Sequence, residues 1–134
     1  KGASILLGGE VPDGKGWFYP VTILENIKPG MPAYDDELFG PVASFIKAEN
    51  DAEAMQIAND SRYGLGGGIF TTDKEKAIKL AREEFDTGMV NINGYSLAQP
   101  NLPFGGVKDS GYGREHGGFG MREFVNEKTI FISE

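Results

Sequence analysis

Apolar residues alternate between strand-like runs and helix-like stripes along the middle of the chain. The runs at residues 42–47, 66–71 and 89–93 have the length and apolar character of strands. Between them, the segments that follow Asn50 and Thr72 place their apolar residues on one helical face. Parallel strands need crossovers, usually helical, so this order predicts an α/β fold: an open parallel sheet with flanking helices.

Both expected helices begin with a polar residue that can cap the amino end. Asn50 is followed three positions later by Glu53, and Thr72 is followed in the same way by Glu75. In such a capping box the first side chain accepts a hydrogen bond from the backbone of the later residue, and the acid reciprocates. The second helix is expected to end at Gly88, because glycine suits a left-handed carboxyl cap.

The two ends of the chain carry different patterns. Residues 4–7 and 18–23 are expected to be short extended pieces, separated by a turn-rich stretch. Residues 94–118 are dense in Gly, Pro, Asn and Ser, and a loop of that length in a compact domain tends to be functional or disordered. A short helix at 119–125 and a final β-branched strand at 127–133 are expected to follow. That strand could reach across to a partner subunit.

Composition excludes several partners. The 134 residues carry a formal net charge of −7, and an acidic surface repels phosphate, so we expect neither nucleic acid nor an anionic membrane as a partner. No apolar run approaches the roughly 20 residues of a membrane span, and the first residues lack a signal-peptide pattern. The chain contains no cysteine, hence no disulfide, thiolate ligand or thiol nucleophile. A reducing, cytoplasmic location fits this composition.

Three short patterns resemble known sites but depart from them. GLGGGI, from Gly64, lacks the third glycine of a dinucleotide loop and precedes a strand, so we favour close backbone packing. GYGREHG has His116 where the third glycine should stand. This lone histidine has no neighbours at metal-ligand spacing and is interpreted as structural, and no metal site is expected. Asp109 and Ser110 lack a nucleophile-elbow pattern, so a hydrolase triad is rejected.

The hexapeptide ELFGPV, residues 37–42, carries the first candidate site. Pro41 restricts Gly40 to extended conformations, and the pair predicts a rigid corner just before a strand. Glu37 and Phe39 then lie on a loop at a strand end, where ligands of open α/β sheets usually bind. The carboxylate can accept hydrogen bonds from two sugar hydroxyls, and the phenyl ring offers a flat apolar face. A surface acid beside a buried phenylalanine explains the hexapeptide equally well.

A second constellation lies in the glycine-rich loop. NLPFGGVKDSGYGRE, residues 101–115, puts a phenylalanine before a Gly-Gly pair and ends in Arg-Glu. Together with ELFGPV, GLGGGIFTTD, GMVNIN and EFVNEKTIFI, it resembles the C-terminal portion of an aldehyde dehydrogenase. The resemblance covers nearly all of the chain, in the family's order and at its spacings. LPFGGVKDSGYGRE followed by GMREFVNEKTI is most similar to the succinate-semialdehyde dehydrogenase branch.

The resemblance implies roles for individual residues. In the family's E-x-F-G-P motif the acid, here Glu37, binds the hydroxyls of the nicotinamide ribose of NAD or NADP. The aromatic residue of that motif, here Phe39, packs by the nicotinamide ring. Phe104 corresponds to an aromatic residue beside the substrate tunnel. Ala98 falls at a tunnel position that varies with the aldehyde accepted, and Asn93 begins that loop.

The resemblance also implies an assembly. Residues 127–132 match the segment that such enzymes contribute to an oligomerisation sheet, so a homo-oligomer, dimer or tetramer, is expected. Residues 1–126 are accordingly expected to be the C-terminal part of a catalytic domain, and residues 127–134 the oligomerisation strand and the C-terminus. Some members bind a monovalent cation through backbone near a K-x-S-G segment, which is here residues 108–111.

The chain lacks the nucleophile on which the family's chemistry depends. A cysteine thiolate attacks the aldehyde, the adduct gives hydride to NAD or NADP, and a glutamate-activated water releases the acid. With no cysteine here, we expect the nucleophile and the general base upstream of this chain. The chain alone is then an inactive piece of an enzyme that oxidises an aldehyde, with succinate semialdehyde the expected substrate. The alternative is a non-catalytic α/β module that keeps the fold for binding or assembly.

Overall fold

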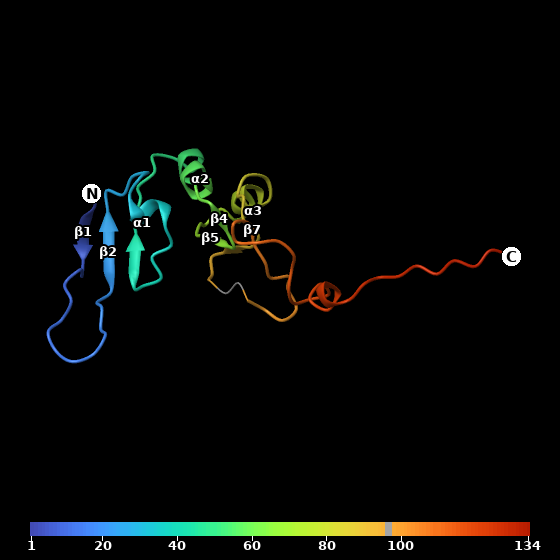
Figure 1. The fold of residues 1–134 in the computed structure, drawn as a ribbon. Helices are drawn as coiled ribbons and strands as arrows, with labels where there is room; N and C mark the ends of the chain where they lie inside the picture. The colour runs from blue at the N-terminus through green and yellow to red at the C-terminus, as the bar shows by residue number, and fades with distance from the viewer. Residues whose placement is uncertain (96–97) are drawn as a thin grey trace. The chain divides into compact units, whose positions relative to one another are not determined.

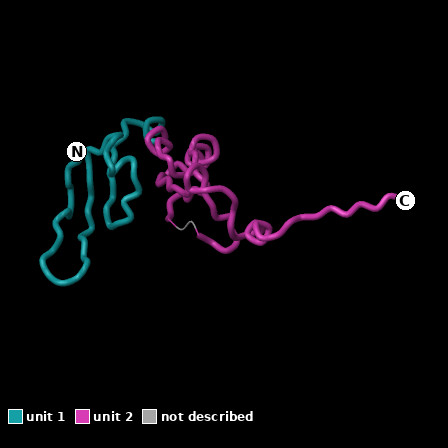
Figure 2. Tube along the Cα trace, in the orientation of Figure 1, with its two compact units in different colours: residues 1–54 teal, residues 55–134 magenta. Residues whose placement is uncertain are grey.

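The structure, a computed structural model, describes residues 1–95 and 98–134. Residues 96 and 97 of the expected glycine-rich loop therefore lie outside the described residues. The chain divides into two units, Lys1–Ala54 and Met55–Glu134, shown in different colours in Figure 2. No helix of the described residues is long and apolar enough to cross a membrane.

Unit 1 is built on a three-stranded mixed sheet with the order β1-β2-β3. The strands are β1 (Ser4–Leu7), β2 (Thr22–Glu25) and β3 (Val42–Ser44), drawn as the blue to green arrows of Figure 1. β2 runs antiparallel to β1 and parallel to β3. A one-turn helix, α1 (Pro32–Asp35), lies in the connection between β2 and β3. The chain between β2 and β3 is thus a short crossover.

The second extended piece lies later in the chain than the sequence predicts. It was expected at residues 18–23, but the ladder runs over Thr22–Glu25. Pro20 has no N–H to donate, and its carbonyl accepts a hydrogen bond from the Thr22 hydroxyl at 3.0 Å. The same hydroxyl accepts from the backbone N–H of Gly9 at 3.0 Å, and Thr22 is 1% exposed. The buried hydroxyl thereby ties the long hairpin connection to the sheet, and Ile27 is the buried apolar residue among those described in this unit.

The helix α2 (Asp51–Asn59) begins where the sequence predicts. The side chain of Asn50 accepts a hydrogen bond from the backbone N–H of Glu53 at 3.0 Å, which confirms the expected cap. The Glu53 carboxylate reaches the backbone N–H of Glu49 at 2.6 Å, one residue before the position that a regular capping box uses. The boundary between the two units falls within this helix.

Unit 2 contains two separate two-stranded sheets. β5 (Gly67–Ile69) and β6 (Val90–Ile92) pair in parallel, and α3 (Lys74–Glu83) is the crossover between them. This confirms the predicted strand–helix–strand unit. β4 (Tyr63–Gly64) pairs antiparallel with β7 (Val107–Lys108), which the sequence did not indicate.

The expectation of one open parallel sheet is wrong in detail. The described chain has mixed α/β content, but its strands are two to four residues long and form three separate sheets, two of which contain an antiparallel pair. Each short strand forms its backbone hydrogen bonds with the strand that the connecting loop brings next to it. The connection between β1 and β2 and the glycine-rich loop before β7 both bring an antiparallel neighbour.

Helix α3 is capped by a different residue from the one expected. The Asp73 carboxylate accepts a hydrogen bond from the backbone N–H of Lys76 at 3.0 Å, so the cap is Asp73 and not Thr72. The Thr71 hydroxyl in turn accepts from the N–H of Asp73 at 3.0 Å, which fixes the entry to the helix. α3 packs on β6 and buries Ala77.

The glycines of GLGGGI allow close backbone packing, as interpreted from the sequence. A Cβ added to Gly64 would lie 2.7 Å from Cγ2 of Val107. A Cβ added to Gly67 would collide with the ring of Phe85, just beyond α3. Both strands of this segment therefore approach their neighbours at distances that no larger residue permits.

The carboxyl end of unit 2 is less regular than expected. The helix predicted at 119–125 is a single 3₁₀ turn, η1 (Arg122–Phe124). The strand predicted at 127–133 forms no ladder with any described residue, because a strand needs a paired neighbour and this chain offers it none. Its apolar side chains are exposed, Phe131 to 84%. Pairing of this segment with another subunit stays a prediction.

Candidate functional site

The first candidate site is the loop between α1 and β3 in unit 1. The Gly40 carbonyl accepts the N–H of Val42 at 2.7 Å, and the Pro41 carbonyl accepts the N–H of Thr22 at 2.8 Å. These two bonds make the tight corner that the sequence predicts. Phe39, just before the corner, has a backbone φ of 47°, in the left-handed region that bulky residues rarely adopt. Its side chain is 90% exposed.

The same loop carries an acidic side chain two positions before Phe39. Glu37 is exposed, and within residues 1–95 and 98–134 its carboxylate makes no hydrogen bond or ion pair. The interpretation of the hexapeptide as a surface acid beside a buried phenylalanine is wrong in its second half, because Phe39 is exposed. An open carboxylate and an open phenyl ring, two residues apart, offer hydrogen-bond acceptors and an apolar face to one ligand.

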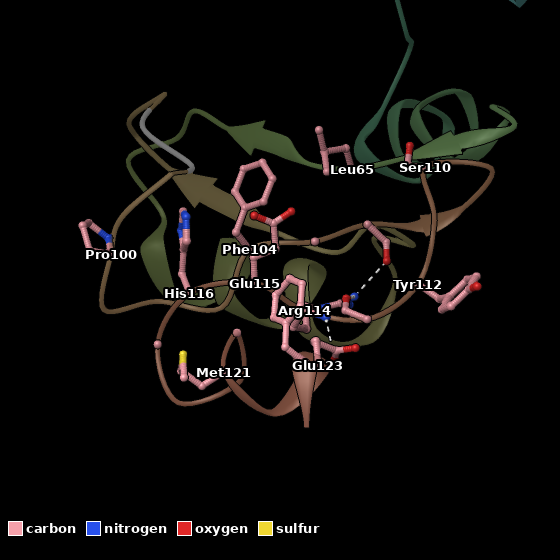
Figure 3. Close-up of a pocket in the computed structure, with 16 residues that line it drawn as sticks. Leu65, Pro100, Phe104, Ser110, Tyr112, Arg114, Glu115, His116, Met121 and Glu123 are labelled. Carbon is pink, nitrogen blue, oxygen red and sulfur yellow. Dashed lines mark hydrogen bonds between the residues drawn. The ribbon is translucent and has the colours of Figure 1, made fainter. Parts of the chain in front are cut away.

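The second candidate site is a cavity of about 630 Å³ in unit 2. Figure 3 shows its labelled side chains, which come from the position just after β4, the loop before β7, the loop after β7 and the turn η1. Phe104, Arg114, Glu115, His116 and Met121 are among those that line it. The cavity combines an aromatic residue, a guanidinium, a carboxylate and an imidazole in one wall.

Phe104 is held on this wall by backbone pairing and a ring contact. Its N–H donates to the Glu115 carbonyl at 2.9 Å, and the N–H of Glu115 donates back to the Phe104 carbonyl at 2.7 Å. The ring centroids of Phe104 and His116 lie 5.7 Å apart at an interplanar angle of 43°. In the part of the chain that the structure describes, no group of three or more His, Cys, Asp or Glu side chains could hold a metal ion. The described contact of the histidine ring is its packing against Phe104.

Arg114 closes the glycine-rich loop on itself. Its Nη1 donates to the Gly106 carbonyl at 2.9 Å and to the Gly113 carbonyl at 2.6 Å. Its backbone N–H donates to the Glu123 carboxylate at 3.5 Å, and both residues line the cavity (Figure 3). The approach requires a glycine, because a Cβ on Gly105 would lie 2.6 Å from the Gly113 carbonyl oxygen.

The segment expected to lie near a monovalent cation is anchored by its side chains. Lys108 Nζ donates to the carbonyls of Asn59 and Ser61 at 3.0 and 3.1 Å, where α2 ends, and lies 3.4 Å from an Asp86 oxygen. Asp109 pairs with the Arg62 guanidinium at 2.6 Å. These contacts engage the side chains of Lys108 and Asp109. Binding of a monovalent cation near the backbone of this segment stays a prediction.

Ser110 has a structural contact of its own. Its hydroxyl accepts the backbone N–H of Gly64 at 3.0 Å and so fastens the glycine-rich loop to β4. This hydrogen bond and the ion pair of Asp109 give both side chains structural contacts, and the rejection of a hydrolase triad stays a prediction.

The expected tunnel residues do not gather around one cavity. Among the described residues, Phe104 lines the cavity of unit 2, whereas Asn93 and Ala98 do not. Ala98 is exposed. The Asn93 carboxamide is engaged with the backbone of Thr71, accepting from its N–H and donating to its carbonyl at 2.8 Å each. The tunnel assignment of Ala98 and Asn93 stays a prediction.

Sequence reasoning missed Arg114 as an organiser of this region. A signal for it does exist in the sequence. A loop made largely of glycine has no ladder to satisfy its carbonyls, and a guanidinium within it is a donor that can reach several of them. The contact between His116 and Phe104 has no local sequence signal, because the two residues are twelve positions apart in an irregular segment.

Comparisons with known proteins agree with the family resemblance. The sequence model of the aldehyde dehydrogenase family matches residues 1–130. The chain is 47% identical to the NADP⁺-dependent succinate-semialdehyde dehydrogenase of Deinococcus radiodurans, over 97% of this chain and 27% of that enzyme. The succinic semialdehyde dehydrogenase of Streptococcus pyogenes, solved with NADP⁺, superposes with a TM-score of 0.93 at 44% identity, over 99% of this chain and 29% of that one.

A third match binds the other nicotinamide cofactor. An aldehyde dehydrogenase of Mycobacterium tuberculosis, solved with NAD⁺, superposes with a TM-score of 0.92 at 39% identity, over 98% of this chain and 27% of that one. The chain therefore spans less than a third of the length of each of these relatives.

Proposed function

The chain belongs to the aldehyde dehydrogenase family, and from this premise we propose that it supplies the nicotinamide-facing loop and part of the substrate tunnel of an NAD(P)-dependent enzyme. That enzyme oxidises an aldehyde to its carboxylic acid, and succinate semialdehyde is the substrate we propose. The substrate assignment rests on relatives whose names carry it, at 44 to 47% identity.

The open pair of side chains on the α1–β3 loop carries this proposal. The Glu37 carboxylate is exposed and unengaged within the described residues, so its two oxygens are available to the two hydroxyls of a ribose. Phe39 keeps a left-handed backbone, which costs about 1–3 kcal/mol at a non-glycine residue, while its ring packs against little in this chain. A bound nicotinamide would give that ring a partner. When bound, the nicotinamide supplies the hydride acceptor.

The rest of the chemistry is proposed to lie outside these residues. The chain has no cysteine, so it cannot provide the thiolate that attacks the aldehyde. Since the chain spans 27 to 29% of its relatives, we place the nucleophile and the general base in the remaining part of the enzyme. The chain alone is then inactive. A reducing, cytoplasmic compartment suits an enzyme that relies on a free thiolate.

A homo-oligomer is proposed through residues 127–134. Ile130, Phe131 and Ile132 are all largely exposed, and the segment has no ladder partner among the described residues. Apolar, β-branched segments with free backbone groups pair with other chains. Replacing Phe131 by Asp should lower the sedimentation coefficient of the assembled protein, and Lys128→Asp is the matched change at an exposed polar position. An unchanged assembly in both variants would remove this part of the proposal.

A hybrid enzyme tests the proposal. Residues 1–130 of this chain would replace the matching segment of the Deinococcus radiodurans enzyme, and NADP⁺ reduction would be followed with succinate semialdehyde and with butanal. We expect turnover with a preference for succinate semialdehyde. Turnover of butanal alone would refute the substrate assignment. A folded hybrid that binds NADP⁺ without any turnover would favour the alternative, a non-catalytic binding or assembly module.

A further inference from the structure

Asn93 joins the chain that leaves β5 to the chain that leaves β6. Its Oδ1 accepts the N–H of Thr71 at 2.8 Å, and its Nδ2 donates to the carbonyl of the same residue at 2.8 Å. Its own backbone N–H donates to the Ile69 carbonyl at 2.9 Å. Three hydrogen bonds therefore converge on one residue at the end of the parallel pair, and the two from the carboxamide form a clamp on Thr71.

The same residue has the local features of a chemically labile asparagine. Asn93 is exposed, and it is followed by Gly94, which has no side chain of its own. Its φ of 57° lies in the left-handed region. The chain contains seven asparagines, and of these Asn93 is the one followed by glycine. The other six are Asn26, Asn50, Asn59, Asn91, Asn101 and Asn126.

We propose that Asn93 is a site of spontaneous deamidation whose rate is governed by opening of its clamp on Thr71. The backbone nitrogen of Gly94 loses its proton to water or hydroxide and attacks Cγ of Asn93. A new N–Cγ bond forms, the Cγ–Nδ2 bond breaks, and the amide nitrogen leaves as ammonia. Water then opens the cyclic imide at either carbonyl, which yields aspartate or isoaspartate. The net change consumes one water and releases one ammonia, with no redox step.

The clamp opposes the first step because it fixes the carboxamide on Thr71. Both polar atoms of the Asn93 side chain are engaged with Thr71, so Cγ cannot turn toward the Gly94 nitrogen while both hydrogen bonds persist. Reaction then proceeds from the locally opened state, and its rate follows the population of that state. The inference does not depend on the proposed enzymatic activity, because it rests on contacts within unit 2.

Deamidation changes the clamp chemically. A carboxylate can still accept the N–H of Thr71, but it has no hydrogen to donate to the Thr71 carbonyl. Two oxygens then face each other where a donor and an acceptor met, and isoaspartate also lengthens the backbone by one carbon. Either product should loosen the junction from which the loop to Ala98 and Phe104 begins. The reaction would therefore act as a slow, irreversible change at the entrance to the glycine-rich loop.

The rate test compares the full chain in native buffer with the same chain unfolded in urea, at one mildly alkaline pH. Peptide mapping by mass spectrometry would give the acid fraction at Asn93 and at Asn101 over days. We expect Asn93 to deamidate faster than Asn101 in urea, and about tenfold more slowly in the native chain than in urea. Equal rates at Asn93 in the two conditions would overturn the protective role of the clamp. Equal rates at Asn93 and Asn101 in urea would overturn the assignment of a labile site.

One pair of variants tests whether deamidation loosens the junction, and a third variant tests the cyclic imide route. Asn93→Asp mimics one product, and Asn101→Asp places the same charge elsewhere in the loop. Hydrogen exchange of the backbone amide at position 93, which donates to Ile69, should accelerate several-fold in N93D and stay unchanged in N101D. An unchanged rate in N93D, or an equal increase in both, would contradict a loosened junction. In G94A the added methyl shields the nitrogen, so persistence of the full rate in urea would contradict the cyclic imide route.

Discussion

Nη1 of Arg114 and the carbonyl oxygen of Gly106 lie 2.9 Å apart, and this hydrogen bond draws together the two arms of the glycine-rich loop. The same nitrogen also donates to Gly113 at 2.6 Å. A lysine side chain is one bond shorter, so its Nζ cannot reach the position from which Nη1 donates to both carbonyls. We expect R114K to lower the free energy of unfolding of this region by about 1–2 kcal/mol. Hydrogen exchange at the Glu115 amide, which is bonded to Phe104, measures the change directly.

The matched control for that variant is R122K. Arg122 is exposed and makes a 3.9 Å ion pair with Glu127, so its replacement by lysine should change stability by less than about 0.5 kcal/mol. Equal acceleration of exchange at Glu115 in R122K and R114K would contradict the role assigned to Arg114.

The sequence pattern and the structure assign the amino-terminal cap of α3 to different residues, and mutation can distinguish them. The structure assigns the cap to Asp73, which accepts from Lys76, whereas the sequence pattern indicated Thr72. D73A should destabilise the helix by about 1 kcal/mol, and T72A should leave it within about 0.5 kcal/mol. Urea unfolding followed by far-ultraviolet circular dichroism compares the two. A larger loss in T72A would show that the helix begins as the sequence pattern suggested.

Glycine 88 should tolerate no side chain. A Cβ at this position would collide with the Gly105 carbonyl and lie 2.8 Å from Cα of Gly106, both of which are backbone atoms that cannot rotate away. G88A should therefore cost about 2 kcal/mol. Gly118 is the matched control, because an added Cβ there meets no atom within 4 Å. Equal urea midpoints for G88A and G118A would contradict the packing described for the glycine-rich loop.

Features encoded within a few residues could be predicted from the sequence. The Asn50 cap, the corner at Gly40 and Pro41, and the strand–helix–strand unit of β5, α3 and β6 all rest on local patterns, and the structure contains each of them. The candidate cofactor pair was found in the same way, because Glu37 and Phe39 stand two positions apart on one loop.

Features that depend on distant or very short segments could not be predicted. β4 and β7 are two residues each, and they pair across more than forty positions, so neither has a periodic signal. The helix α1 is four residues long, and its one local signal is Pro32 at the first turn. Thr72 and Asp73 both suit a cap, and the choice between them depends on the Thr71 hydroxyl, which receives the Asp73 amide.

The most direct test of the account is the cofactor affinity of the hybrid enzyme after the change Glu37→Gln. The amide keeps the size of the side chain but loses the charge that strengthens hydrogen bonds to ribose hydroxyls. We expect KM for NADP⁺ to rise about tenfold, with KM for the aldehyde little changed. Asp36→Asn, the same change of charge one residue earlier, should leave both values as they were. An unchanged KM for NADP⁺ in E37Q, or an equal rise in D36N, would contradict the assignment of Glu37 to the cofactor.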